Sequence, residues 1–186
     1  QMITGVIVWF RPDERLSVAE VADTYHKMTM RLAVMFAPAA NGTPADFENE
    51  VRGIGVASGF GNEWLKIDAI GEMIADGGMT FRTAFTREHY HDDATYHGVP
   101  STSKERLMSN VSIGNRLGWR FSIHSVGDAA IDWVLDAYEA ADKERSIAAR
   151  RFAVMHGSLI RQDQLERMKK LGVTLQLQNA FMWEKA

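Results

Sequence analysis

The chain has 186 residues, of which 46% are hydrophobic, and a formal net charge of -3. These values suit one soluble domain with a hydrophobic core and exclude a disordered or collagen-like chain. The 21 Lys and Arg are scattered among 24 Asp and Glu, so no basic surface for nucleic acid or membrane is expected. The absence of cysteine excludes disulfides and thiol nucleophiles, and it leaves only nitrogen and oxygen ligands for a metal. We therefore expect a small-molecule substrate.

No apolar run reaches the roughly 20 residues that cross a bilayer. The first residues also lack the basic-then-apolar pattern of a signal peptide. The expected location is therefore the cytoplasm.

Short apolar segments alternate with amphipathic ones along the chain. Strands are predicted at residues 5–10, 31–36, 64–69, 120–124, 151–156 and 173–178. Helices are predicted from a capping box at Ser17 to residue 28, from an N-cap at Thr43, and at residues 103–117, 129–141 and 163–171. Residues 87–103 are polar and aperiodic, which predicts a long loop.

The order helix, glycine, strand occurs at Gly118 and again at Gly172, which indicates βα repeats and a parallel sheet. His124 and His156 end successive predicted strands 32 residues apart. A (β/α) barrel of eight units allots roughly 31 residues to each unit. We therefore predict an α/β fold of the TIM-like barrel type, with residues 1–186 forming one domain.

His124 and His156 are candidate metal ligands. Because the carboxyl ends of parallel strands meet at one mouth, the two imidazoles are expected to converge there, and two imidazoles suit a divalent metal. A histidine at one such position is more often structural, so the matched positions carry this prediction.

Lys66 lies in an otherwise apolar predicted strand, where an unpaired ammonium group is costly to bury. Three roles are compatible with the sequence: an exposed lysine, a Schiff-base nucleophile or a carbamylated metal ligand. The residue type alone leaves all three open.

Three segments resemble signatures of the family 3 amidohydrolases: residues 61–67 (GNEWLKI), 123–132 (IHSVGDAAID) and 155–158 (MHGS). The second segment is the most specific of them. The similarity extends from about residue 31 to residue 181.

The resemblance implies that CO₂ carboxylates Lys66, which then bridges two divalent metal ions, expected to be zinc, at the end of the fourth barrel strand. His124 and His156 would complete one metal site from the fifth and sixth strands. Such a centre hydrolyses a C–N bond of an amide or cyclic amide, or an ester, with a metal-activated water. The family also has a His-x-His pair on its first strand and an Asp on its eighth, and neither is in its expected place here. The resemblance therefore implies an incomplete barrel, about strands two to seven of eight, from a longer protein.

Three other residues are candidates of lower standing. His89 and His91 form the chain's one His-x-His pattern, but they lie in the predicted loop, where ligands lack the fixed geometry of strands. Asp128 is predicted to cap a helix or to orient His124 through a hydrogen bond.

Two rival hypotheses remain at this stage. The chain could be a non-catalytic barrel fragment that covers its open sheet edges by forming a homo-oligomer. It could instead be an aldolase or lyase in which Lys66 forms a Schiff base. Under the hydrolase hypothesis, this piece by itself is expected to be inactive.

Overall fold

The computed structural model describes residues 7–10, 20, 31–39 and 42–178. Six parallel strands form one sheet in sequence order: β1 (Ile7–Phe10), β2 (Leu32–Phe36), β3 (Leu65–Ile74), β4 (Phe121–Ser125), β5 (Ala153–His156) and β6 (Thr174–Gln176). The helices that connect the later strands are α2 (Pro44–Gly53), α3 (Lys104–Arg116), α4 (Asp128–Glu144) and α5 (Gln162–Leu171). The predicted α/β fold with βα repeats is therefore confirmed. The predicted helix from Ser17 to residue 28 lies outside the described residues, except for Glu20, which is helical.

Local sequence signals set most of the helix boundaries. Thr43 is the N-cap of α2, as its sequence predicts, and it also forms a capping box with Asp46. Gly118 and Gly172 both adopt positive φ after their helices, which a residue without Cβ does at little cost. None of the described helices is long and apolar enough to cross a membrane.

One strand differs from its prediction in a way that matters for function. β3 was expected at residues 64–69 but continues to Ile74, because its second half pairs with β4, from Ile70 opposite Phe121 to Ile74 opposite His124. Pairing with a neighbouring strand overrides the weak local preference of glycine and glutamate for strands. The extension adds Glu72 to the sheet.

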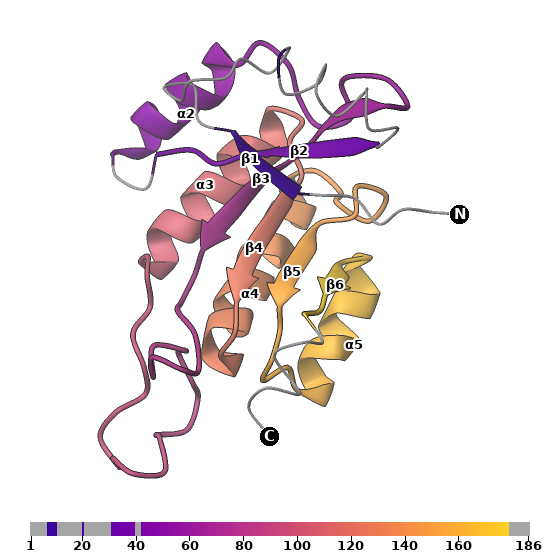
Figure 1. The fold of residues 1–186 in the computed structure, drawn as a ribbon. Helices are drawn as coiled ribbons and strands as arrows, with labels where there is room; N and C mark the ends of the chain where they lie inside the picture. The colour runs from indigo at the N-terminus through magenta and orange to yellow at the C-terminus, as the bar shows by residue number, and fades with distance from the viewer. Residues whose placement is uncertain (1–6, 11–19, 21–30, 40–41, 179–186) are drawn as a thin grey trace.

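The helices cover one face of this sheet and form the main core with it. In Figure 1, α3, α4 and α5 lie behind the strands. Fully buried side chains on this side include Ile70, Leu107, Phe121, Ile131 and Phe152. Removing such large apolar side chains from water is the chief driving force for folding. The other face holds a much smaller apolar cluster, of Met35, Ala69 and Met155.

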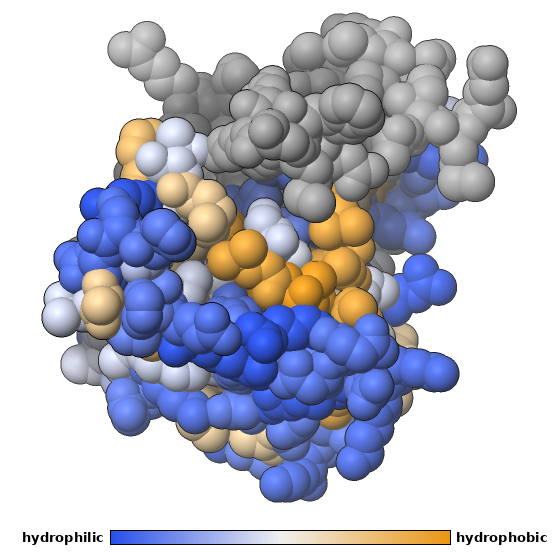
Figure 2. Space-filling model, turned by 90° about the horizontal axis from the view of Figure 1, so that it is seen from below, coloured by the Kyte–Doolittle hydropathy of each residue, from blue (hydrophilic) through white to orange (hydrophobic). Residues whose placement is uncertain are grey.

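The carboxyl ends of the later strands form a distinct end of the molecule. The connection between β3 and α3, residues 75–103, extends beyond these strand ends (Figure 1). Figure 2 views this end and shows apolar surface at its centre, bordered by hydrophilic residues. Side chains that leave the carboxyl ends of the strands are therefore close to the surface here.

Candidate metal centre

Three potential metal ligands meet at the carboxyl ends of adjacent strands. Glu72 belongs to β3, His124 to β4 and His156 ends β5. Oε1 of Glu72 lies 2.9 Å from Nδ1 of His124 and 2.8 Å from Nε2 of His156. The two imidazole rings are 4.4 Å apart between centroids and nearly edge to face. Among the described residues, this is the one group of three or more His, Asp or Glu whose ligand atoms all lie within 4.8 Å of one another.

His124 reaches the site through ordinary strand alternation. Ile123 packs in the helix-covered core, so the next side chain points to the opposite face of the sheet. Nε2 of His124 also lies 3.4 Å from the carbonyl oxygen of Gly77. Donation from Nε2 to this carbonyl leaves the Nδ1 lone pair facing Glu72, where a cation would be bound.

Two irregularities bring the other two ligands to the same face. In β3, Ile70 and Met73 both pack toward the helix-covered core although they are three residues apart, because the register with β4 shifts between them. This bulge moves Glu72 onto the opposite face. In β5, Met155 already points to that face, and His156 joins it by adopting a φ of 70°, which is rare for a residue with a side chain. Backbone strain of this kind is concentrated at functional sites.

The electrostatics of the cluster favour a bound cation. Burial by itself raises the pKa of Glu72. The hydrogen bonds to His124 and His156, and the charges of these two histidines, lower it by more, so the pKa falls to about 2. For His124, burial by itself lowers the pKa. The hydrogen bond with Glu72 and the negative charge of that carboxylate outweigh burial, so the pKa of His124 is raised. The site therefore contains a partly buried carboxylate whose ionised form is favoured and which attracts positive charge.

This donor set fits a divalent transition metal. Two imidazole nitrogens and one carboxylate oxygen are the ligands that catalytic zinc takes in several hydrolases, with a fourth position left for water. The carboxylate supplies negative charge, and neutral imidazoles supply nitrogen lone pairs. Nothing in the cluster needs to be replaced for it to hold such an ion.

Comparison with known proteins places this chain in a family. The family 3 amidohydrolase model matches residues 21–185, which is most of the chain. The chain belongs to the amidohydrolase family. The predicted resemblance to the family 3 amidohydrolases is thereby confirmed.

Curated relatives of this amidohydrolase chain are longer proteins. It is 26% identical to Protein LONG AFTER FAR-RED 3 of Arabidopsis thaliana over 125 residues, 67% of this chain and 21% of that protein. It is 29% identical to the putative amidohydrolase YtcJ of Bacillus subtilis over 60% of this chain and 20% of that protein. It is 34% identical to the N-substituted formamide deformylase of Arthrobacter pascens over 47% of this chain and 16% of that protein. The chain therefore matches about a fifth of the length of each relative.

Solved structures agree with the family assignment. An uncharacterized metal-dependent hydrolase from Pyrococcus furiosus superposes with a TM-score of 0.69 at 27% identity, over 89% of this chain and 32% of that one. A second one, from Pyrococcus horikoshii OT3, gives a TM-score of 0.68 at 28% identity, over 87% and 30%. Both neighbours are described as metal-dependent hydrolases.

The structure of the amidohydrolase chain does not bring Lys66 to this cluster. Lys66 is exposed near the start of β3, where it pairs with Ala33, whereas Ile74 pairs with His124 at the other end. Glu72 follows Lys66 by six residues, which is at most about 20 Å of strand at about 3.3 Å per residue. Lys66 therefore does not lie with His124 and His156, where the resemblance expected it, and its roles as metal ligand or Schiff-base nucleophile stay predictions. Glu72, which the sequence analysis missed, lies beside the histidines instead.

Asp128 has neither of its predicted roles. Gly127 is the N-cap of α4 and no side chain caps this helix; Asp128 is the first helical residue. Its carboxylate accepts hydrogen bonds from the backbone N–H of Arg87, at 2.8 Å, and from Nη1 of Arg161, at 3.2 Å. It therefore joins the β3–α3 connection to the segment before α5 rather than orienting His124.

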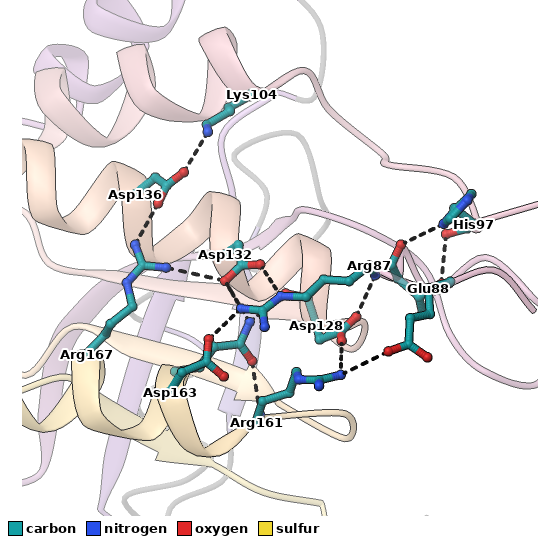
Figure 3. A network of polar contacts seen from close by, with 12 residues as sticks. Arg87, Glu88, His97, Lys104, Asp128, Asp132, Asp136, Arg161, Asp163 and Arg167 are labelled. Atoms are coloured by element: carbon teal, nitrogen blue, oxygen red, sulfur yellow. Dashed lines mark hydrogen bonds and ion pairs between the residues drawn. The ribbon is translucent and has the colours of Figure 1, made fainter.

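Asp128 is one member of a network that fixes the β3–α3 connection (Figure 3). The guanidinium of Arg87 binds both carboxylate oxygens of Asp132 on α4, at 2.6 and 2.7 Å, and Asp163 on α5, at 2.7 Å. A bidentate arginine–carboxylate pair is among the more specific polar contacts. Farther along α4, Arg167 and Lys104 both bind Asp136, which ties α5 and α3 to the same helix.

Asp128→Asn is expected to destabilise the chain by about 1–3 kcal/mol, because one carboxylate oxygen that accepts a hydrogen bond is replaced by a donor. Chemical denaturation followed by tryptophan fluorescence measures this loss. The exposed residue Asp92 provides a matched control, since Asp92→Asn removes only a surface ion pair with Arg82. Equal stabilities of the two variants would contradict the joining role of Asp128.

The histidines of the connection do not form a second metal site within the described residues. Nδ1 of His89 lies 2.9 Å from the carbonyl oxygen of Tyr90, and its ring packs edge-on to His97, with centroids 6.4 Å apart. His91 is exposed. The low standing of His89 and His91 as metal candidates stays a prediction.

Proposed function

We propose that this chain provides the metal-binding part of a hydrolase that cleaves a C–N bond, of an amide or cyclic amide, or an ester. The proposal rests above all on one observation: a ring nitrogen of His124 and a ring nitrogen of His156 both lie beside the same carboxylate oxygen, Oε1 of Glu72. The family assignment and the metal-dependent hydrolases among the structural neighbours support it.

The proposed cofactor is one divalent ion, with zinc the best match to the donor set. When bound, such an ion supplies a Lewis acid and a water that ionises near neutral pH. Nδ1 of His124 and Nε2 of His156 would hold it from two strands, and Glu72 would add an anionic oxygen from a third. Glu72 thereby takes the place that the sequence resemblance gave to a carboxylated Lys66.

The residues around the ion would have two further tasks. Gly77 fixes the ring of His124 by accepting from Nε2, so that Nδ1 keeps its lone pair for the metal. The strained backbone of His156 keeps its imidazole on the same face as Glu72. We also propose that the sheet is part of a (β/α) barrel of a longer protein, with the helices outside and the ligand-bearing face inside.

Chelation of the full-length protein tests this function. Hydrolysis of a panel of simple amides, cyclic amides and esters is expected to stop after treatment with a chelator and to return when zinc is added back. Hydrolysis that persists unchanged in a chelator, with no metal in the purified protein by elemental analysis, would overturn the proposal.

A further inference from the structure

A pocket of about 640 Å³ lies between the β3–α3 connection and the segment that follows β5. One wall is the β3–α3 connection, with Met79 and Tyr90, and the other is the segment after β5, with Ser158, Leu159, Ile160 and Arg161. A volume of this size is typical of sites for small molecules, which range from roughly 300 to 1,000 Å³.

Each wall begins two residues after a residue of the candidate metal centre or one that contacts it. Gly77, whose carbonyl faces His124, precedes Met79 by two residues, and Ser158 follows His156 by two residues. Two residues of extended chain span at most about 7 Å. The first residue of each wall therefore lies within about 7 Å of the backbone of Gly77 or His156.

The pocket is already formed without a ligand. The guanidinium of Arg82 lies over the rings of Tyr90 and Tyr96, 5.5 and 5.3 Å from their centroids. The hydroxyl of Tyr90 donates a hydrogen bond to the carbonyl oxygen of Ala84, at 2.8 Å, which fixes the Tyr90 side chain within the β3–α3 connection. Asp128 binds both walls at once, through Arg87 and Arg161. Preformed walls reduce the entropy lost on binding.

The pocket lining holds two carboxylates, of Asp128 and Glu88, and one guanidinium, of Arg161. Arg161 pairs with Asp128 at 3.2 Å and approaches Glu88 at 3.9 Å, so its charge is already balanced within the wall. The remaining contacts that a ligand would make include the apolar side chains of Met79, Leu159 and Ile160. An anionic group entering here would lose hydration and meet two carboxylates, because the guanidinium of Arg161 is already paired with Asp128.

We infer that this pocket selects the substrate by holding an uncharged, largely apolar group, of about the size of an aromatic ring, next to the bond that is hydrolysed. The inference rests on the hydrolase function proposed above and specifies its substrate class. An aryl-substituted amide fits this description, and an amide with a carboxylate on the ring does not.

Binding of two matched probes to the chain tests this inference. Acetanilide is neutral, and 4-acetamidobenzoate is the same molecule with an added carboxylate. By ligand-observed NMR, the chain is expected to bind acetanilide about tenfold more tightly than 4-acetamidobenzoate, a difference of about 1.4 kcal/mol. Met79→Asp places a carboxylate in the pocket and is expected to weaken acetanilide binding about tenfold as well. Phe81→Asp is the matched control, because Phe81 lies on the same connection but is 80% exposed.

The outcomes separate the pocket from the metal chemistry when binding is measured with zinc and with a chelator. Three results would contradict substrate selection by this pocket while leaving the proposed hydrolase function unaffected. They are zinc uptake without acetanilide binding, equal binding of the two probes, and equal effects of Met79→Asp and Phe81→Asp. Acetanilide binding that depends on Met79 in a chain that takes up no zinc would support the pocket and count against the hydrolase.

Discussion

Glu72→Gln is expected to weaken zinc binding to the chain by at least about 100-fold, more than the 10- to 100-fold typical of changes to groups that only orient a ligand. The substitution keeps the size of the side chain but removes its negative charge and one ligand oxygen. The two histidines would remain with a neutral amide between them, and two imidazoles alone hold zinc weakly. Isothermal titration with zinc at neutral pH measures the loss directly.

Two controls make this result specific to Glu72. Lys66→Ala is expected to leave the zinc affinity unchanged, because Lys66 is exposed at the far end of β3. Glu63→Gln removes an exposed carboxylate just before β3 and is likewise expected to have no effect on binding. A loss of zinc in the Lys66 variant together with normal binding by the Glu72 variant would restore the carboxylated-lysine hypothesis and contradict the site described above.

Asp76→Ala is expected to lower the free energy of unfolding by about 3 kcal/mol, because it leaves three backbone N–H groups without acceptors at about 1 kcal/mol or more each. The fully buried carboxylate of Asp76 accepts from Phe85, Val126 and Gly127 at 2.8 to 2.9 Å. These contacts hold the β3–α3 connection against the start of α4, next to the metal ligands. Urea unfolding followed by circular dichroism measures the change. A loss near zero would show that the connection is held by its other contacts alone.

The isosteric variant Asp76→Asn makes the same contact testable by pH, even if the alanine variant does not fold. Burial raises the pKa of Asp76 above its ordinary value of 3.8, and three backbone hydrogen bonds only partly oppose this shift. Because the folded-state pKa is raised, the stability that comes from protonation is fully present below the unfolded pKa and is lost as the pH rises through the folded pKa. Asparagine does not titrate.

The wild-type advantage over Asp76→Asn is therefore expected to be largest below pH 3.8 and to shrink toward neutral pH, when both proteins are compared without metal. Urea unfolding of the two proteins across this range measures the difference. An advantage that grows with pH would mean that the backbone N–H groups lower the pKa of Asp76 more than burial raises it.

The parts of the fold that follow from local chemistry could be predicted from the sequence. The cap at Thr43 and the glycines at 118 and 172 mark helix ends through contacts within a few residues. The βα order and the matched positions of His124 and His156 then follow from apolar segments separated by helices. These features need no knowledge of which strands pair in which register.

Glu72 could not be predicted in the same way, because its place depends on contacts between distant segments. β3 continues through Gly71 and Glu72 only because β4 pairs with it, and the register shift then reverses which side chains face the helices. One signal was available in the sequence, because Glu72 is an isolated charged residue in the apolar run from Ala69 to Ile74. An unpaired carboxylate there is costly to bury, which is the same argument that made Lys66 a candidate. The motif resemblance favoured Lys66, whereas the register of β3 brings Glu72 to the histidines.

The turn of His156 toward the site and the three hydrogen bonds of Asp76 also lay outside the reach of the sequence. A φ of 70° at His156 is set by the packing around it rather than by the residue type. The partners of Asp76 are 9, 50 and 51 residues away along the chain. The sequence therefore predicted that His124 and His156 lie close together at the carboxyl ends of their strands. It did not predict that Glu72 joins them.

A crystal structure of the chain soaked with zinc, with anomalous diffraction recorded at the zinc edge, tests the central claim most directly. We expect one anomalous peak about 2.0–2.2 Å from Oε1 of Glu72, Nδ1 of His124 and Nε2 of His156. A peak at a carboxylated Lys66, or no peak between these three residues, would contradict the claim that Glu72 and the two histidines form the metal centre.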